Sequence, residues 1–221
     1  MPTTRLRLPR TAYPGVLVTF CGVDGSGKTT LLAETARVVR DAGWAAYETR
    51  MPTQWSRDTA LVKRFFYEPD PVVRAKADFL AVSLVLMSDR LQHLREEVLP
   101  RLEAGEVVLS DRYVFHAFAL ADATGNGTDE IAAIARHFPM PDVAFFLDPS
   151  PDLAVARVRS RERERHRRFD EAFLRAQAAA YQGIAAEVDG CVVATDGSVD
   201  EAMERVAPVV RDALARRSRQ A

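Results

Sequence analysis

The feature that most constrains this chain is a glycine-rich loop, GVDGSGKTT at residues 22–30, directly after the apolar run VLVTFC. It has the spacing G-x-x-x-x-G-K-[ST] of a phosphate-binding loop between a buried strand and a helix. Its glycines let successive N–H groups turn toward phosphate oxygens. A chance glycine turn is the alternative, but four defined positions in this context favour a nucleoside triphosphate site. The residues expected to form it are Gly22, Asp24, Gly25, Ser26, Gly27, Lys28, Thr29 and Thr30.

Two side chains at the end of this loop suit the chemistry of a bound triphosphate. Lys28 can reach the β- and γ-phosphates, and the hydroxyl of Thr29 can bind Mg²⁺. We therefore predict ATP and Mg²⁺ as cofactors. The same kind of loop serves GTPases, motor ATPases and transporters, so it leaves the reaction open.

Apolar segments that read as buried strands alternate with segments of helical spacing. This pattern predicts an α/β fold with a mostly parallel sheet covered on both faces. We expect a loop at 51–58 and a long helix or helix pair over 72–99 that ends at Pro100. Without an internal repeat or a long linker, residues 15–217 should form one domain, preceded by a disordered arm at 1–14. The expected strands are 16–22, 44–50, 106–111, 141–148 and 191–196.

Charge and cysteine usage narrow the cellular setting. The chain has 221 residues and a formal net charge of -1, which gives no general reason to expect a nucleic acid or a membrane surface as partner. Cys21 and Cys191 lie in or beside apolar runs, as reduced core thiols of a cytoplasmic protein do. No apolar run approaches the length of a membrane span, and the basic N-terminus lacks the apolar core of an export signal.

A carboxylate and an arginine end the third expected strand, in VLSDRY at residues 108–113. Asp111 is well placed to hold Mg²⁺ through water, beside the phosphate loop. Arg112 would direct a planar, bidentate donor into the crevice at the carboxyl ends of the strands. An exposed ion pair closing the strand is the alternative. A second Asp-Arg pair, Asp89 and Arg90, lies inside an otherwise apolar helix, where solvated charges are the usual alternative to a function.

Arginines alternate with glutamates in RVRSRERERHRRFD, residues 157–170, without the period of a helix packed on a core. A solvated, salt-bridged helix or a nucleic-acid patch would fit this composition. Beside a phosphate loop we favour a lid, at about 157–169, whose arginines neutralise charge on a transferring phosphoryl group and exclude water. The four histidines show no metal-ligand spacing and none is assigned as a base. Phosphoryl transfer needs little covalent chemistry from the protein.

Taken in order, four motifs resemble the thymidylate kinase family over most of residues 16–210. They are VTFCGVDGSGKTTLL, TRMP, LMSDRLQHLREEVLPRLEAGEVVLSDRY and PDVAFFLDPSPDLAVARVRSR. The resemblance implies a three-layer P-loop nucleoside monophosphate kinase fold with a five-stranded parallel sheet, and a homodimer. It also implies transfer of the ATP γ-phosphoryl group, with Mg²⁺, to a pyrimidine deoxynucleotide 5′-monophosphate.

The resemblance assigns roles residue by residue. Lys28 and the loop amides would bind the ATP phosphates, and Thr29 and Asp111 would hold the metal. Asp24 would lie near the acceptor sugar and the metal, and Arg112 would hold the acceptor phosphate. Further acceptor contacts would be Arg50 of the R-x-P segment, Arg90 facing the base, and Tyr181 on the helix after the lid. The catalytic lid arginine is expected among Arg159, Arg161, Arg163 and Arg165.

The acceptor side departs from the family pattern. The family usually has a glutamate at the place of Cys21, commonly an aromatic at Leu86, and polar or tyrosine side chains at Ala117 and Leu120. Gln182 replaces an acid often found beside the tyrosine. Buried hydrogen-bonding groups and stacking rings carry much of the selectivity for a base. Phosphorylation of dTMP to dTDP is the first expectation. A paralogue acting on a modified nucleotide or another small-molecule acceptor is the second, and a nucleotide-dependent switch is the third.

Overall fold

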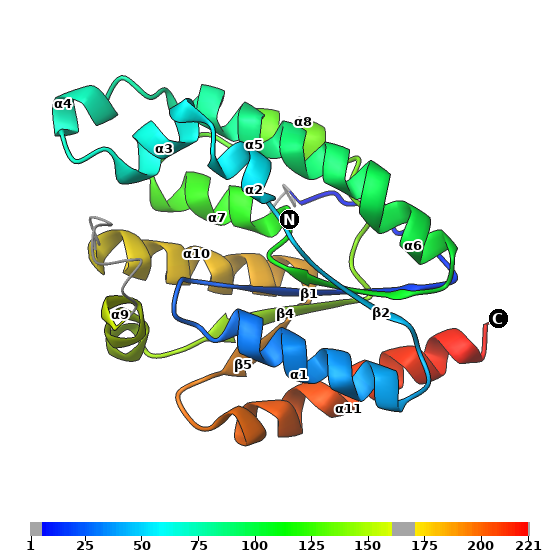
Figure 1. The fold of residues 1–221 in the computed structure, drawn as a ribbon. Coiled ribbons are helices and arrows are strands. Elements are labelled where there is room, and N and C mark those ends of the chain that lie inside the picture. Colours follow the sequence, from blue (N-terminus) through cyan, green and yellow to red (C-terminus); the bar gives the residue numbers. More distant parts are fainter. Residues whose placement is uncertain (1–5, 161–170, 221) are drawn as a thin grey trace.

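The computed structural model describes residues 6–160 and 171–220, which form a five-stranded sheet with helices on both faces (Figure 1). Its strands pair in parallel, in the order β2-β3-β1-β4-β5. The strands are β1 (Val16–Gly22), β2 (Ala46–Arg50), β3 (Val107–Asp111), β4 (Val143–Asp148) and β5 (Cys191–Ala194). The α/β class and the five parallel strands expected from the sequence are confirmed.

The central strands are buried on both faces, which is why their sequences are continuous apolar runs. Alternate residues of β1 enter two separate cores. Val18 and Phe20 pack with α1 (Lys28–Asp41) and α11 (Val199–Ser218), whereas Leu17 and Cys21 face the helices on the other side. Figure 1 shows α1 and α11 below the sheet and the other long helices above it, so the molecule has three layers.

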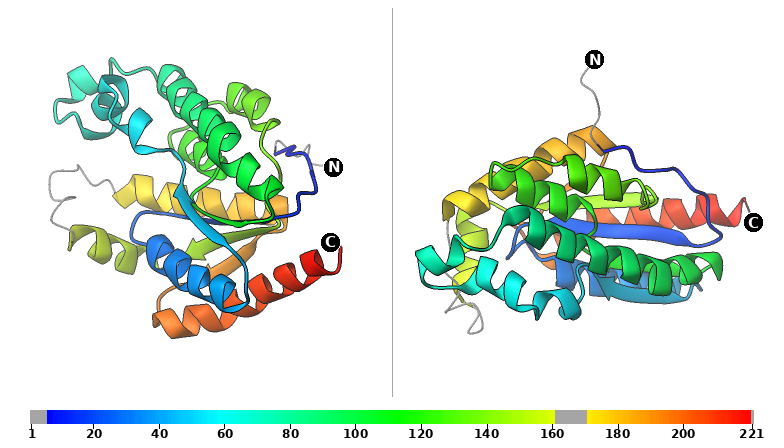
Figure 2. Two further views of the ribbon diagram at one scale, coloured as in Figure 1. Left: turned by 45° about the vertical axis from the view of Figure 1, so that its right-hand side comes forward. Right: turned by 90° about the horizontal axis from the view of Figure 1, so that it is seen from above.

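Two helical regions differ from the expectation. A short helix, α2, forms in the segment predicted as a loop, and the Thr53 side chain caps it by accepting a hydrogen bond from the N–H of Trp55. The long helix does not end at Pro100 but continues through a π-helical turn to Glu103. Pro100 lies at the start of α6, directly after the π-helical turn, where the regular helical hydrogen-bond pattern is interrupted. Figure 2 shows α2, α3 and α4 together beside α5. The remaining elements are α2 (Gln54–Arg57), α3 (Ala60–Tyr67), α4 (Pro71–Arg74), α5 (Phe79–His93), η1 (Leu94–Val98), α6 (Leu99–Glu103), α7 (Phe115–Ala123), α8 (Asp129–Ala135), α9 (Pro151–Arg159) and α10 (Glu171–Val188).

The N-terminal segment also differs from the disordered arm predicted for residues 1–14. In its described part, residues 6–14, Leu6 and Leu8 are buried, with 3% and 8% of their surface exposed. The N–H of Leu6 donates to the Glu187 side chain, and the Pro9 carbonyl accepts from Met140. The expectation of disorder is wrong for this part, because two leucines cover the edge of the core.

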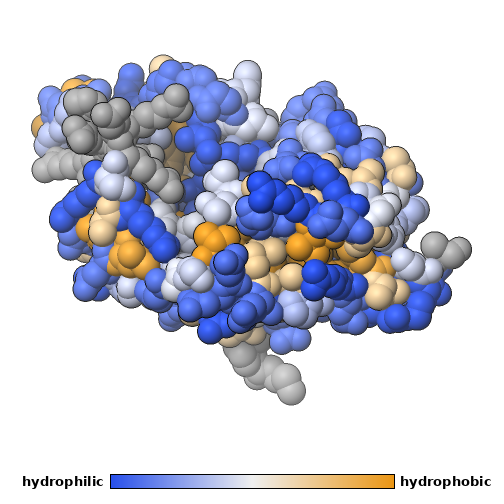
Figure 3. Space-filling model, turned by 60° about the horizontal axis from the view of Figure 1, so that its bottom comes forward, coloured by the Kyte–Doolittle hydropathy of each residue, from blue (hydrophilic) through white to orange (hydrophobic). Residues whose placement is uncertain are grey.

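Three further features concern the helices, the surface and the cysteines. None of the described helices is long and apolar enough to cross a membrane. Figure 3 views the face that carries α1 and α11, where apolar surface forms a narrow strip among hydrophilic residues. Both cysteines are free, and burial raises the pKa of Cys21 to about 12, which makes it an inert core thiol.

Candidate active site

The glycine loop leaves β1 in backbone conformations that other residues rarely adopt. Gly22, Gly25 and Gly27 have φ angles of 147°, 83° and 90°. A Cβ atom at Gly25 would lie 2.6 Å from the carbonyl oxygen of Ala154 in α9. The loop therefore packs directly against the helix that leads to the arginine-rich segment. Glycine is required at this position for both conformation and space.

Lys28 is enclosed by the loop that precedes it. Its Nζ donates hydrogen bonds to the carbonyl oxygens of Gly22 (3.1 Å) and Val23 (2.7 Å) and to Oγ of Ser26 (3.2 Å). Burial, followed by the charge of Arg112, lowers the pKa of Lys28 to about 8. A polyphosphate bound in the loop would favour the charged form and raise this pKa again. Protonation of the lysine is thus coupled to anion binding.

Thr29 and Asp111 form the candidate metal pair. Phe20 of β1 pairs with Asp111, which brings the end of β3 beside the loop. The Thr29 hydroxyl donates to Oδ2 of Asp111 at 3.2 Å, whereas Oδ1 is buried without a hydrogen bond among the described residues. A hydroxyl and a carboxylate oxygen are ligands that Mg²⁺ binds, together with phosphate oxygens and water. Within the described ranges there is no cluster of three metal-binding side chains. An ion bound to this pair would take its remaining ligands from a nucleotide and water.

Arg112, the next residue, has a φ angle of 68°, in the left-handed region that non-glycine residues rarely adopt. Its N–H donates to the carbonyl oxygen of Phe20 at 2.8 Å, which holds the turn. The guanidinium is buried and forms an ion pair with Asp24 of the loop. Burial alone lowers the pKa of Arg112, but Asp24 and Asp111 raise it above its ordinary value. The turn therefore holds a permanently charged group between the loop and the acceptor side.

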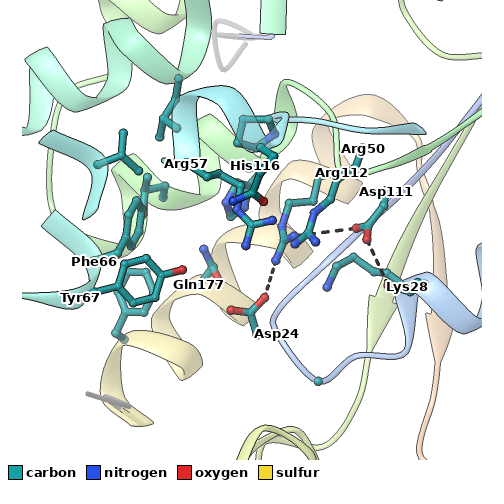
Figure 4. A pocket seen from close by; sticks show the side chains of 18 of the residues that line it. Asp24, Lys28, Arg50, Arg57, Phe66, Tyr67, Asp111, Arg112, His116 and Gln177 are labelled. Carbon is teal, nitrogen blue, oxygen red and sulfur yellow. Dashed lines mark hydrogen bonds and ion pairs between the residues drawn. The ribbon is translucent and has the colours of Figure 1, made fainter. Parts of the chain in front are cut away.

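A cleft of about 640 Å³ extends from these residues toward α3 and α10. In Figure 4, Lys28 and Asp111 lie at one end of it and Phe66 and Tyr67 at the other, with Arg112 between them. One end is therefore charged and the other is largely apolar. The apolar end is lined by Val62, Phe66, Leu86, Leu120 and Phe173.

A second hollow, of about 290 Å³, also borders the glycine loop. Its walls are loop residues, Arg157 of α9 and the segment between β5 and α11. Nη1 of Arg157 donates to the carbonyl oxygen of Gly25 at 3.4 Å. The hydroxyl of Thr195, in the wall, is buried and has no hydrogen-bond partner in the described part of the chain. The loop therefore borders both hollows.

The family model for thymidylate kinase matches residues 20–206, which contain the loop, the turn at Arg112 and the cleft. The chain belongs to the thymidylate kinase family. It is accordingly a nucleoside monophosphate kinase. The probable thymidylate kinase of Pyrococcus horikoshii is 31% identical over 147 residues, 66% of this chain and 71% of the relative. The thymidylate kinase of Oceanobacillus iheyensis is 30% identical over 174 residues (76% and 75%), and that of Caldicellulosiruptor saccharolyticus 28% over 211 residues (92% and 99%).

Among the acceptor contacts expected for a thymidylate kinase, Arg50 lines the cleft but Arg90 does not. Arg90 is fully buried in α5, and its Nη1 donates to the carbonyl oxygen of Leu86 at 3.1 Å. Its Nε and Nη2 form no hydrogen bond with any described residue, and burial lowers its pKa to about 10. The neighbouring Asp89 accepts hydrogen bonds from Thr53 and Ser56 and so anchors α2. A contact between Arg90 and the base stays a prediction.

The expected lid is described only at its start. Arg159 ends α9, is exposed, and forms an ion pair of 2.7 Å with Glu171, the first residue of α10. Arg161, Arg163 and Arg165 lie outside the described residues. Which lid arginine assists transfer stays a prediction.

Sequence reasoning missed the parts of the cleft that carry no motif. Aromatic surface in the cleft comes from Phe66 and Tyr67 of α3 and from Phe173 of α10. At position 86, where the family commonly has an aromatic side chain, this thymidylate kinase has a leucine. Their contribution depends on how α3 and α10 pack, which no local pattern shows. The sequence does contain a signal that could have identified His116, which also lines the cleft. It is an isolated polar residue in the apolar run VFHAFALA, four positions after the arginine that ends the strand.

Proposed function

We propose that the chain transfers the γ-phosphoryl group of ATP to the 5′-phosphate of dTMP, forming dTDP and ADP. The observation that carries this proposal is the convergence of Lys28, the Thr29–Asp111 pair and the Asp24–Arg112 pair at the charged end of one cleft. A cleft that leads from such a charged end to an apolar pocket suits a nucleotide, whose phosphate is charged and whose base is largely apolar.

The donor triphosphate binds the loop N–H groups and Lys28, at the start of α1. Mg²⁺ held by Thr29 and Asp111 would neutralise charge on the β- and γ-phosphate oxygens. The nucleobase of ATP occupies the second hollow, next to Arg157. In this arrangement the γ-phosphate lies at the charged end of the acceptor cleft.

The acceptor phosphate binds Arg112, which Asp24 holds in place. One of its oxygens attacks the γ-phosphorus in line with the leaving oxygen of ADP, so that one P–O bond forms as the other breaks. No protein base is needed, because the attacking oxygen is already ionised at neutral pH. Lys28 stabilises charge on the transferring group. The lid arginines exclude water, which would otherwise accept the phosphoryl group.

An assay of ADP release over a panel of nucleoside monophosphates tests this function. Strong stimulation by dTMP is expected, and turnover that does not depend on any acceptor would favour a nucleotide-dependent switch. Lys28→Ala is expected to abolish transfer while the protein still unfolds in one cooperative transition. Near-normal turnover in that variant would contradict the assignment.

One observation favours a second acceptor. Leu86 and Leu120 line the apolar end of the cleft, at positions where the family commonly carries aromatic side chains. Ala117, where a polar side chain is common, is 4% exposed. A modified nucleotide or another small-molecule phosphate acceptor would use this altered pocket. Stimulation of ADP release only by such a compound, and not by dTMP, would select this alternative.

A homodimer and a cytoplasmic setting are part of the proposal. Leu80 and Leu84, one turn apart on α5, are 40% and 44% exposed and give this helix an apolar outer edge. A second copy of the chain would cover it. Sedimentation velocity should give the mass of a dimer for the wild type and of a monomer for Leu84→Glu. A monomeric wild type would contradict the dimer.

A further inference from the structure

His116 lies in the wall of the cleft and is held by a buried phenol. Its Nδ1 is 2.7 Å from the hydroxyl of Tyr181 in α10, and the two rings are nearly parallel. Tyr181 is 3% exposed, whereas His116 is only partly buried and borders the cleft (Figure 4). The histidine is therefore fixed from behind, and its other nitrogen, Nε2, is on the opposite edge of the ring.

The hydrogen bond to Tyr181 indicates which nitrogen of His116 carries the proton. Burial, Arg112 and Arg90 lower the pKa of His116 well below its ordinary value, so the ring is neutral at neutral pH. Burial raises the pKa of Tyr181, which therefore stays a protonated phenol. Among the described residues, Nδ1 of His116 is the hydrogen-bond partner of the phenol oxygen, and the buried O–H would be left unpaired unless it donates to Nδ1. The hydrogen of the neutral imidazole is then on Nε2.

The position of His116 along the chain indicates what this N–H meets. Arg112, His116 and Leu120 all line the cleft and are spaced four residues apart. His116 and Leu120 lie on α7, where four residues correspond to about 6 Å along the axis. Along the cleft, the proposed phosphate contact at Arg112 is thus followed by the imidazole of His116 and then by the apolar pocket at Leu120. A nucleotide with its phosphate at Arg112 and its base in the apolar pocket would therefore place the bond between its sugar and its base near the imidazole.

We propose that His116 is a specificity-determining residue whose Nε2–H donates a hydrogen bond to the carbonyl oxygen beside the glycosidic nitrogen of a pyrimidine base, with Tyr181 as its positioning residue. The inference rests on the proposed function. The contact would separate pyrimidines from purines, because thymine, uracil and cytosine share this 2-carbonyl and purines lack it. The contact offsets the loss of polar side chains at Ala117 and Leu120.

A cycle of variants and substrate analogues tests the contact. The wild type and His116→Ala are assayed by ADP release with dTMP, 2-thio-dTMP and 4-thio-dTMP, in which a weakly accepting sulfur replaces one carbonyl oxygen. His116→Ala should lower kcat/KM for dTMP about 3- to 10-fold, the range expected for one hydrogen bond, mainly by raising KM. It should cause little further loss with 2-thio-dTMP, because the contact is already weakened there.

Three further variants separate this contact from a structural role. His116→Gln keeps an N–H donor at similar reach and should retain most of the preference for dTMP over 2-thio-dTMP. Tyr181→Phe should reduce that preference about threefold, because the tautomer is no longer held. His137→Gln, at an exposed position outside the cleft, should behave as wild type.

The outcomes that would overturn the inference are specific. An equal fold-loss of kcat/KM on all three substrates would show that His116 has a structural role and donates no hydrogen bond to the base. Non-additivity with 4-thio-dTMP alone would place the contact at the other carbonyl oxygen. In each of these cases the wild type still phosphorylates dTMP. A wild type that does not use dTMP would refute the proposed function itself.

Discussion

Raising the pH above about 8 should weaken ATP binding and stabilise the free protein, because both properties depend on the charge of Lys28. Burial lowers the pKa of this lysine from 10.5 to about 8. Between those values the unfolded chain holds a proton that the folded chain has released. The destabilisation from burying the charge is therefore fully present below the folded pKa and disappears as the pH rises toward the unfolded pKa.

The pKa values give the size of both effects. The difference between 10.5 and about 8 corresponds to about 3 kcal/mol in total. About 1 kcal/mol of it should be regained between about pH 7.5 and 9. A bound triphosphate favours the charged lysine, so over the same interval the Kd for ATP should rise about eightfold.

Urea unfolding of the wild type and of Lys28→Met at several pH values measures the first effect. The difference between the two proteins removes contributions from other groups, including Cys21, whose pKa of about 12 makes stability fall above its unfolded value of 9.0. Titration calorimetry with ATP and the wild type measures the second effect. A stability difference that does not change with pH, or a Kd that rises less than about twofold, would refute the coupling.

Three further predictions concern the loop, the cleft and the N-terminal segment. Gly25→Ala should destabilise the protein by about 1–3 kcal/mol and weaken ATP binding, because its Cβ would meet a backbone oxygen at 2.6 Å. Gly127→Ala, where no atom lies within 4 Å, is the control, and equal effects of the two in urea unfolding would count against this reason. Phe66→Ala should raise KM for the acceptor about 3- to 10-fold and leave KM for ATP unchanged in steady-state assays. Leu6→Ser should lower the free energy of unfolding by about 2 kcal/mol, and an unchanged urea midpoint would contradict the packing of this segment.

The charged end of the cleft could be predicted because each part of it is contiguous in sequence. The glycine loop, Lys28 and Thr29 follow one strand, and Asp111 and Arg112 end another. Parallel strands bring their carboxyl ends to one edge of the sheet, so the meeting of the two motifs follows from the fold class. The ion pair between Asp24 and Arg112 is a product of that meeting.

The acceptor half could not be predicted in the same way. Phe66 and Phe173 belong to helices that are more than one hundred residues apart in the chain, and neither lies in a motif. Arg90 matches the family pattern, and only the structure shows that it is fully buried and is not among the residues that line the cleft. The burial of Leu6 was missed because a short segment with two leucines has too little periodicity to indicate packing.

What the sequence by itself determined is the phosphate loop, the order of strands and helices, and the family. These depend on local backbone requirements, such as glycine at positive φ, and on apolar runs that bury a parallel strand. Only the tertiary structure decided the shape of the acceptor cleft and the pairing of His116 with Tyr181 across 65 positions. That pairing arises from the packing of α7 against α10, two helices whose side-chain contacts are set by the whole core and not by the residues next to them in the chain.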